Sequence, residues 1–216
     1  IENISKGVST PYVKMTKLIC KNSFNWPPEY DWSNSWIWIA RACITKEEIL
    51  LKGLSDISIQ GDIICAQWAK IFGFKLTNID EGILVRSDQR DFDVINLNFI
   101  SCPDLVQVAV ALAILSKIKF SCSGLETLPF KETDRFKALI DSLLLLGIEV
   151  DDIESNRSFS FDSSSWEPVN DTLNVSSLGD HRMSFFWALI GLRQAISIQD
   201  RETVSKSYPN FWEQWD

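Results

Sequence analysis

Apolar residues recur at helical spacing in some segments of the chain and at alternate positions in others, which predicts a succession of helices and strands. The expected helices span 10–21, 32–43, 61–72, 103–116, 133–146, 181–193 and 208–215. The expected strands span 49–52, 74–78, 83–86, 93–97, 117–121, 148–151, 158–161, 173–175 and 196–199. Pro27 and Pro28 end any regular element between the first two helices. This succession predicts a mixed α/β fold.

Several landmark residues return with a period of about 75 positions, which indicates an internal repeat. The landmarks are an acid at each first helix, a glycine closing two second helices and a lysine ahead of two of them (Asp31, Asp104, Asp180; Gly73, Gly147; Lys131, Lys206). The period predicts three βαβαββ units, the third stopping after its second helix, so that its two closing strands must come from elsewhere. Segment 105–115 is apolar nearly all round, so we expect an inside-out α/β barrel lobe with helices inside and sheets outside.

Composition narrows the class of protein. The 216 residues are 45% hydrophobic and 23% charged, with a formal net charge of −8, as in an ordinary globular protein. So acidic a chain lacks the basic surface of a general nucleic-acid or anionic-membrane binder. The longest apolar run, 105–115, falls short of the roughly 20 residues needed to cross a bilayer.

The five cysteines are odd in number and lack the spacing of metal ligands, so we expect reduced thiols, no metal site and a cytoplasmic location. The chain opens on Ile1 without an initiator Met or a leader peptide. We therefore expect this sequence to be an interior part of a longer polypeptide.

Candidate chemistry gathers at the starts of the predicted helices. The polar groups concerned are Asp104, Lys131, Glu132, Arg135, Asp180, His181, Arg182 and Lys206. Taken singly, each has a structural explanation as a helix cap, a dipole partner or an exposed ion pair. The repeat instead brings them to equivalent ends of related units, where cations would form an anion site and carboxylates could transfer protons.

These segments resemble the C-terminal half of the 5-enolpyruvylshikimate-3-phosphate synthase family. The motifs that carry the resemblance follow the family order: Ser9-Thr10-Pro11-Tyr12, Asp31-Trp32-Ser33, Gln60-Gly61-Asp62, Pro103-Asp104, Lys131-Glu132-Thr133-Asp134-Arg135, Asp180-His181-Arg182-Met183 and Lys206-Ser207-Tyr208-Pro209 with Phe211-Trp212. Their spelling is similar to that of bacterial members. The family fold has two lobes of three βαβαββ units each. The resemblance implies that residues 1–28 are the tail end of the N-terminal lobe and 29–216 the C-terminal lobe, its last unit incomplete.

The resemblance also implies an activity and its residues. Family members transfer the enolpyruvyl group of phosphoenolpyruvate to the 5-hydroxyl of shikimate 3-phosphate and release phosphate, a step toward chorismate and the aromatic amino acids, without a cofactor. By position, Asp104 is similar to the base that takes the hydroxyl proton, and Glu132 to the acid that protonates the methylene carbon. Arg135, Arg182 and Lys206 correspond to the cations that hold phosphoenolpyruvate. Ser9 and Lys131 correspond to contacts with shikimate 3-phosphate, and Asp180 and His181 to the pocket wall.

Departures from the family pattern keep alternatives open. The family is about twice as long, and its N-terminal lobe, a necessary partner, is missing here. Between Lys21 and Asp31 the repeat calls for two strands, but only Asn22 to Tyr30 are available. A catalytically dead remnant or binding lobe of the same fold is one alternative, and a UDP-N-acetylglucosamine enolpyruvyl transferase is another. Trp32, Trp36 and Trp38 crowd one helix, which we ascribe to core or interlobe packing.

Overall fold

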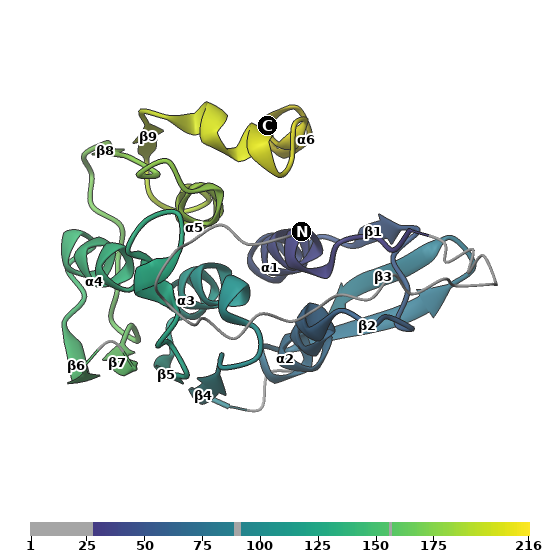
Figure 1. The fold of residues 1–216 in the computed structure, drawn as a ribbon, viewed down its shortest axis with the longest axis horizontal. Helices are drawn as coiled ribbons and strands as arrows, with labels where there is room; N and C mark the ends of the chain where they lie inside the picture. The colour runs from purple at the N-terminus through teal and green to yellow at the C-terminus, as the bar shows by residue number, and fades with distance from the viewer. Residues whose placement is uncertain (1–27, 89–91, 156) are drawn as a thin grey trace, which may run out of the picture.

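The computed structural model describes residues 28–88, 92–155 and 157–216 (Figure 1). The helices are α1 (Trp32–Thr45), η1 (Gly61–Ile64), α2 (Cys65–Ile71), η2 (Pro103–Leu105), α3 (Val106–Leu115), η3 (Leu128–Phe130), α4 (Arg135–Leu145), α5 (His181–Ile190), η4 (Arg201–Lys206) and α6 (Phe211–Trp215). The strands are β1 (Ile49–Lys52), β2 (Phe74–Ile79), β3 (Gly82–Ser87), β4 (Val94–Asn98), β5 (Lys119–Ser123), β6 (Val150–Glu154), β7 (Ser158–Asp162), β8 (Leu173–Val175) and β9 (Ile196–Ile198). The mixed α/β class is confirmed.

The middle third of the chain folds as a βαβαββ unit. Its elements β4, α3, β5, α4, β6 and β7 follow one another, and its four strands form one sheet in the order β4-β5-β7-β6. β4 runs parallel to β5, with Asn98 opposite Ser123, whereas β7 runs antiparallel to both β5 and β6. A parallel pair closed by an antiparallel hairpin is the pattern that the repeat predicts.

The flanking sheets are partial copies of this middle sheet. In the order β1-β3-β2, strand β1 holds the place of β5, but no described strand lies where β4 would be. In the last sheet β8 and β9 pair in parallel, as β4 and β5 do, and no described hairpin follows. The expected helix over 10–21 lies outside the described residues.

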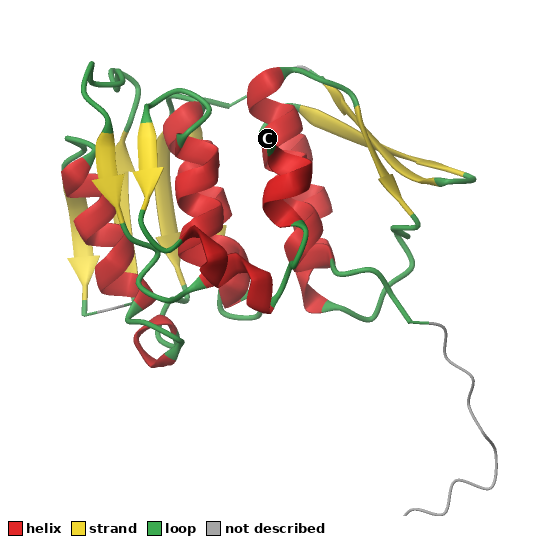
Figure 2. Cartoon of the chain, turned by 90° about the horizontal axis from the view of Figure 1, so that it is seen from above, coloured by secondary structure: helices red, strands yellow, loops and turns green. Residues whose placement is uncertain are grey.

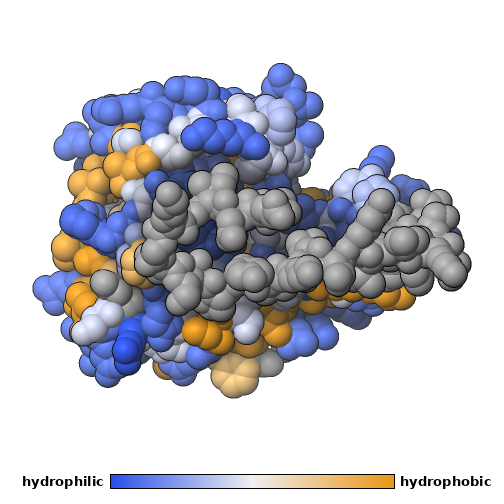
Figure 3. All heavy atoms as spheres, in the orientation of Figure 1, coloured by the Kyte–Doolittle hydropathy of each residue, from blue (hydrophilic) through white to orange (hydrophobic). Residues whose placement is uncertain are grey.

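The helices α1, α3 and α5 pack on one another, with the three sheets around them (Figures 1 and 2). α3 is the central helix, and every residue from Val106 to Ile114 is buried. Trp32 and Trp36 on α1 are also buried, whereas Trp38 packs against the aromatic rings of α6. The aromatic-rich helix therefore serves the core. Hydrophilic residues cover much of the face seen in Figure 3.

Some predicted boundaries were wrong by a few residues, each for a local reason. The strand expected from 117 begins at Lys119, because Lys117 has a positive φ of 55° that a strand cannot contain. The helix expected to reach 193 ends at Ile190 before Gly191. The last helix begins only at Phe211, because a turn containing Pro209 precedes it. Among the described helices, none combines the length and hydropathy of a membrane span.

Candidate functional site

The candidate site lies at the amino ends of α3, α4 and α5, as the repeat predicts. Asp104 lies in η2, directly ahead of α3. Arg135 is the first residue of α4, whose N-cap Asp134 accepts a hydrogen bond from the backbone N–H of Lys137. Asp180 caps α5 by accepting from the N–H of Arg182. The capping side chains of Asp134 and Asp180 thus fix where α4 and α5 begin.

Arg135 joins three carboxylates. Its Nε and Nη2 donate to the two oxygens of Asp180 at 2.6 and 3.1 Å. Its Nη1 donates to Asp104 at 2.8 Å, and Nη2 also donates to Glu132 at 2.7 Å. Burial opposes the charge on Arg135, but the hydrogen bond and the charge of Asp180, with Asp104 and Glu132, prevail and raise its pKa. Arg135 is therefore a permanent cation that ties α3, α4 and α5 together.

Asp104 is in turn held by three cations. Its Oδ1 lies 3.0 Å from Nζ of Lys131 and 2.8 Å from Nη1 of Arg135, and its Oδ2 lies 3.7 Å from Nη2 of Arg182. Burial alone would raise the pKa of this carboxyl, but the three cations outweigh it and hold the pKa below its ordinary value. Asp104 is thus an anion at neutral pH.

Arg182 is buried with unused hydrogen-bonding capacity. Within the part of the chain that the structure describes, its Nε and Nη1 have no hydrogen-bond partner, and its third nitrogen lies 3.7 Å from Asp104. Burial lowers the pKa of Arg182, although Asp104 and Asp31 act against this. A buried donor without a partner costs about 1–3 kcal/mol. An anionic ligand that accepts from these N–H groups would remove this cost.

His181 follows Asp180 in the first turn of α5, half-buried, with its ring edge-on to Phe185. Burial, together with the charge of Arg182, lowers its pKa. The imidazole is therefore neutral at pH 7, so one ring nitrogen can donate a hydrogen bond and the other can accept one.

Two predicted site residues are not brought into this cluster. Lys206 is exposed at the end of η4, and no ion pair or hydrogen bond joins it to the cluster within the described ranges. Ser9 lies outside the described residues. The structure therefore gathers Asp104, Lys131, Glu132, Arg135, Asp180, His181 and Arg182.

Asp62 lies close to this cluster, although sequence reasoning gave it no role. Its carboxylate accepts a hydrogen bond from the hydroxyl of Ser33. Burial raises the pKa of Asp62, although the hydrogen bond from Ser33 and the charge of Arg182 act to lower it. The signal was present in the Gln60-Gly61-Asp62 motif, because it puts an acid at the start of a further helix, η1.

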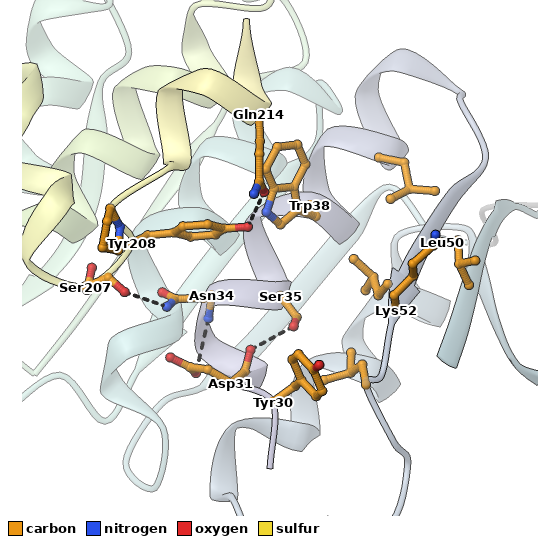
Figure 4. A pocket seen from close by; sticks show the side chains of 14 residues that line it. Tyr30, Asp31, Asn34, Ser35, Trp38, Leu50, Lys52, Ser207, Tyr208 and Gln214 are labelled. Carbon is orange, nitrogen blue, oxygen red and sulfur yellow. Dashed lines mark hydrogen bonds between the residues drawn. The ribbon is translucent and has the colours of Figure 1, made fainter. Parts of the chain in front are cut away.

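No group of three or more His, Cys, Asp or Glu side chains suited to a metal ion occurs in the described residues. A cavity of about 680 Å³ lies elsewhere, between α1, the outer edge of β1 and the segment before α6 (Figure 4). Its lining includes Trp38, Leu50, Lys52 and Tyr208. It adjoins the edge of β1, where the middle unit has β4 and where no described strand lies.

Comparison with known proteins places this geometry in context. A family model described as EPSP synthase (3-phosphoshikimate 1-carboxyvinyltransferase) matches residues 9–215. A 3-phosphoshikimate 1-carboxyvinyltransferase of Bacteroides fragilis is 28% identical over 229 residues, covering 95% of this chain and 55% of the relative. One of Methanospirillum hungatei is 31% identical over 86% of this chain and 42% of the relative. The chain thus spans about half the length of the curated relatives it matches.

A solved EPSP synthase of Acinetobacter baumannii has a similar fold, with a TM-score of 0.66 at 22% identity over 84% of this chain and 44% of that one. At this identity the likeness concerns the fold alone. Relatives include archaeal as well as bacterial proteins, so the bacterial spelling expected from the motifs is not distinctive.

Proposed function

Because the chain belongs to the EPSP synthase family, whose model matches it over residues 9–215, we propose that it carries one half of the active site of a 3-phosphoshikimate 1-carboxyvinyltransferase. The observation that carries the proposal is the buried Arg182, with two N–H groups unpartnered in the described structure, beside the Lys131–Asp104–Arg135 network. Such a site suits small, highly anionic substrates, which phosphoenolpyruvate and shikimate 3-phosphate are.

The proposed reaction proceeds in two balanced steps. First, the 5-hydroxyl oxygen of shikimate 3-phosphate bonds to C2 of phosphoenolpyruvate, its proton passes to Asp104, and Glu132 delivers a proton to the methylene carbon C3. Then the bond from C2 to the phosphate oxygen breaks, phosphate leaves with the proton that Asp104 had taken, and C3 returns a proton to Glu132 as the double bond re-forms, so both carboxyls regain their starting states. Neither step calls for a metal or an organic cofactor.

The contacts within the cluster support this division of roles. Arg135 lies between Asp104 and Glu132 and holds one oxygen of each, so the two carboxylates face one region of the site. Glu132 is about half exposed and pairs only with Arg135 among the described residues. Its side chain is therefore more open to solvent than that of Asp104, which is 35% exposed. Arg182 and Lys131 would hold the ligand anions, with Lys206 and Ser9 as the remaining contacts and Asp180 and His181 as the pocket wall.

The second half of the site would come from polypeptide outside this sequence. Support comes from the relatives, of which this chain covers about half, and from the first and third sheets, in which the described residues supply fewer strands than in the middle sheet. We propose that residues 29–216 correspond to a C-terminal lobe, that turnover needs both halves, and that the chain alone binds its ligands weakly. We also propose a cytoplasmic location, which the free thiols of Cys43, Cys65, Cys102 and Cys122 support.

The test is release of phosphate from phosphoenolpyruvate by the full-length protein, with either shikimate 3-phosphate or UDP-N-acetylglucosamine as acceptor. Release that depends on shikimate 3-phosphate and is abolished by Asp104→Ala is the expected result. Release with the nucleotide sugar alone would reassign the acceptor. No release of phosphate with either acceptor would show that the protein has the fold of the family but not its transferase activity.

A further inference from the structure

The carboxylate of Asp104 has the surroundings of a bound anion. Its two oxygens lie 3.0 Å from Lys131 Nζ, 2.8 Å from Arg135 Nη1 and 3.7 Å from Arg182 Nη2. A phosphate or carboxylate ligand would seek the same donors. The side chains of Asp104 and Lys131 are 35% and 29% exposed, so a ligand from solvent can reach them.

The charges of this cluster indicate that one of its carboxylates moves away from its cations when an anionic ligand binds. The cations Lys131, Arg135 and Arg182 face the carboxylates Asp104, Glu132 and Asp180 in equal number. An anion that enters a neutral cluster gains little attraction, because each cation is already opposed by a carboxylate. Release of cations from their internal partners is therefore part of binding.

The three carboxylates differ in their freedom to move. Asp180 is fully buried, receives two hydrogen bonds from Arg135 and caps α5. Glu132 pairs only with Arg135 in the described part of the molecule, so its departure would free neither Lys131 nor Arg182. Asp104 lies against all three cations, and its movement alone would release two of them, because Arg135 keeps Asp180 and Glu132.

We propose that Asp104 is an internal anion that occupies the ligand site of this chain when no substrate is present and gives up Lys131 and Arg182 to an incoming oxyanion. This inference rests on the proposed function only in taking the ligand to be an oxyanion. It adds a role for Asp104 that precedes proton transfer, namely setting the affinity of the empty site for anions.

The displacement would also couple binding to chemistry. While Lys131, Arg135 and Arg182 face Asp104, they hold its pKa low. A ligand anion that takes over Lys131 and Arg182 removes part of that effect, so the pKa of Asp104 rises toward its ordinary value. The carboxylate thereby becomes a stronger base once the ligand is in place.

The test measures the affinity of the 216-residue chain for inorganic phosphate by calorimetry at pH 7 and low salt. Asp104→Asn keeps the shape of the side chain and removes its charge, so phosphate should bind about tenfold more tightly, as expected when two charge-assisted contacts no longer need to be broken. Glu132→Gln removes the same charge from the same cluster but frees neither Lys131 nor Arg182, so its affinity should change less than twofold. Far-UV circular dichroism checks that both variants are folded, and Asp104→Ser repeats the measurement if the Asn variant is not.

Equal increases in phosphate affinity in the two variants would show that the net charge of the cluster, and not occupancy of the site by Asp104, sets the affinity, which would overturn the proposal. No increase with Asp104→Asn and Asp104→Ser would overturn it as well. This readout needs neither substrate turnover nor the second half of the site. The two proposals can therefore fail separately. If Asp104→Asn binds phosphate more tightly but the full-length protein has no transferase activity, the role of Asp104 as an internal anion is supported and the proposed function is rejected.

Discussion

The guanidinium of Arg135 makes a two-point ion pair with the carboxylate of Asp180, 45 positions further along the chain, and both side chains are almost completely buried. The pair joins the start of α4 to the start of α5. The packing of these helices and the chemistry of the candidate site therefore depend on the same two residues.

Replacing Arg135 by Met should destabilise the chain by about 3–5 kcal/mol, because Asp180 would remain as a buried charge without its partner. Urea unfolding of the 216-residue chain measures this loss. Lys137→Met on the same helix is the matched control, since the pair of Lys137 with Asp141 is exposed and water screens it, so its loss should change stability far less. Similar losses in the two variants would show that the buried pair contributes no more than a surface pair.

Arg41 should hold the C-terminal helix on α1. Its guanidinium lies 4.7 Å from the ring centroid of Trp215 and 5.7 Å from that of Trp38, and it donates to the carbonyl of Trp215. Arg41→Met should cost about 1–3 kcal/mol through lost cation–π and hydrogen-bond contacts. Arg86→Met, which breaks an exposed pair with Glu48, should change stability by less than about 1 kcal/mol. A loss at Arg41 no larger than at Arg86 would contradict the contact.

His181 should titrate below pH 6.5. Burial and the nearby Arg182 favour its neutral form, so the folded chain binds a proton at His181 less readily than the unfolded chain does. The free energy of unfolding should therefore decrease as the pH falls below about 6.5, the value in the unfolded chain. His181 is the only histidine of the sequence, so one imidazole resonance reports its midpoint without assignment. A midpoint at or above the ordinary value would refute the described surroundings.

Asp104 and Asp62 should affect acid stability with opposite signs. The pKa of Asp104 is lowered in the fold, so its stabilising effect is complete above the unfolded value of about 3.9 and is lost as the pH falls through the folded value. The pKa of Asp62 is raised, so its charged form costs stability at neutral pH, and acid relieves that cost.

Unfolding measured from pH 7 down to pH 3 tests both residues together. The stability advantage of the wild-type chain over Asp104→Asn should shrink in acid. The difference between the wild-type chain and Asp62→Asn should instead shift in favour of the wild-type chain. Parallel pH profiles for the two variants would show that these carboxyls occupy similar environments.

Much of the fold was predictable because its signals are local. Helical and alternating spacing located nearly all the described elements, and the returning landmarks predicted that Asp104, Lys131 and Asp180 lie at helix starts. The interactions among them were not predictable, because they depend on how α3, α4 and α5 pack. Nothing local indicates that Arg135 holds three carboxylates while Arg182 keeps two unpartnered donors in the described structure.

The same limit explains what sequence reasoning missed. Core packing was expected for the Trp residues of α1, and the burial of Trp36 against Trp68 and Phe72 confirms it for that residue. Asp62 gained meaning only from its place beside Ser33 and the Arg182 charge. The role of Lys206 stays a prediction from resemblance.

The central claim is an addition and elimination of phosphoenolpyruvate in which Glu132 protonates the methylene carbon, and solvent deuterium tests it most directly. With shikimate 3-phosphate and phosphoenolpyruvate in D₂O, the full-length protein should form product that carries deuterium on the enolpyruvyl methylene, because C3 gains one proton from the site and loses one of three. Glu132→Gln should slow its formation about 10²–10⁴-fold. Product formed at full rate without deuterium, or unaffected by Glu132→Gln, would contradict the account.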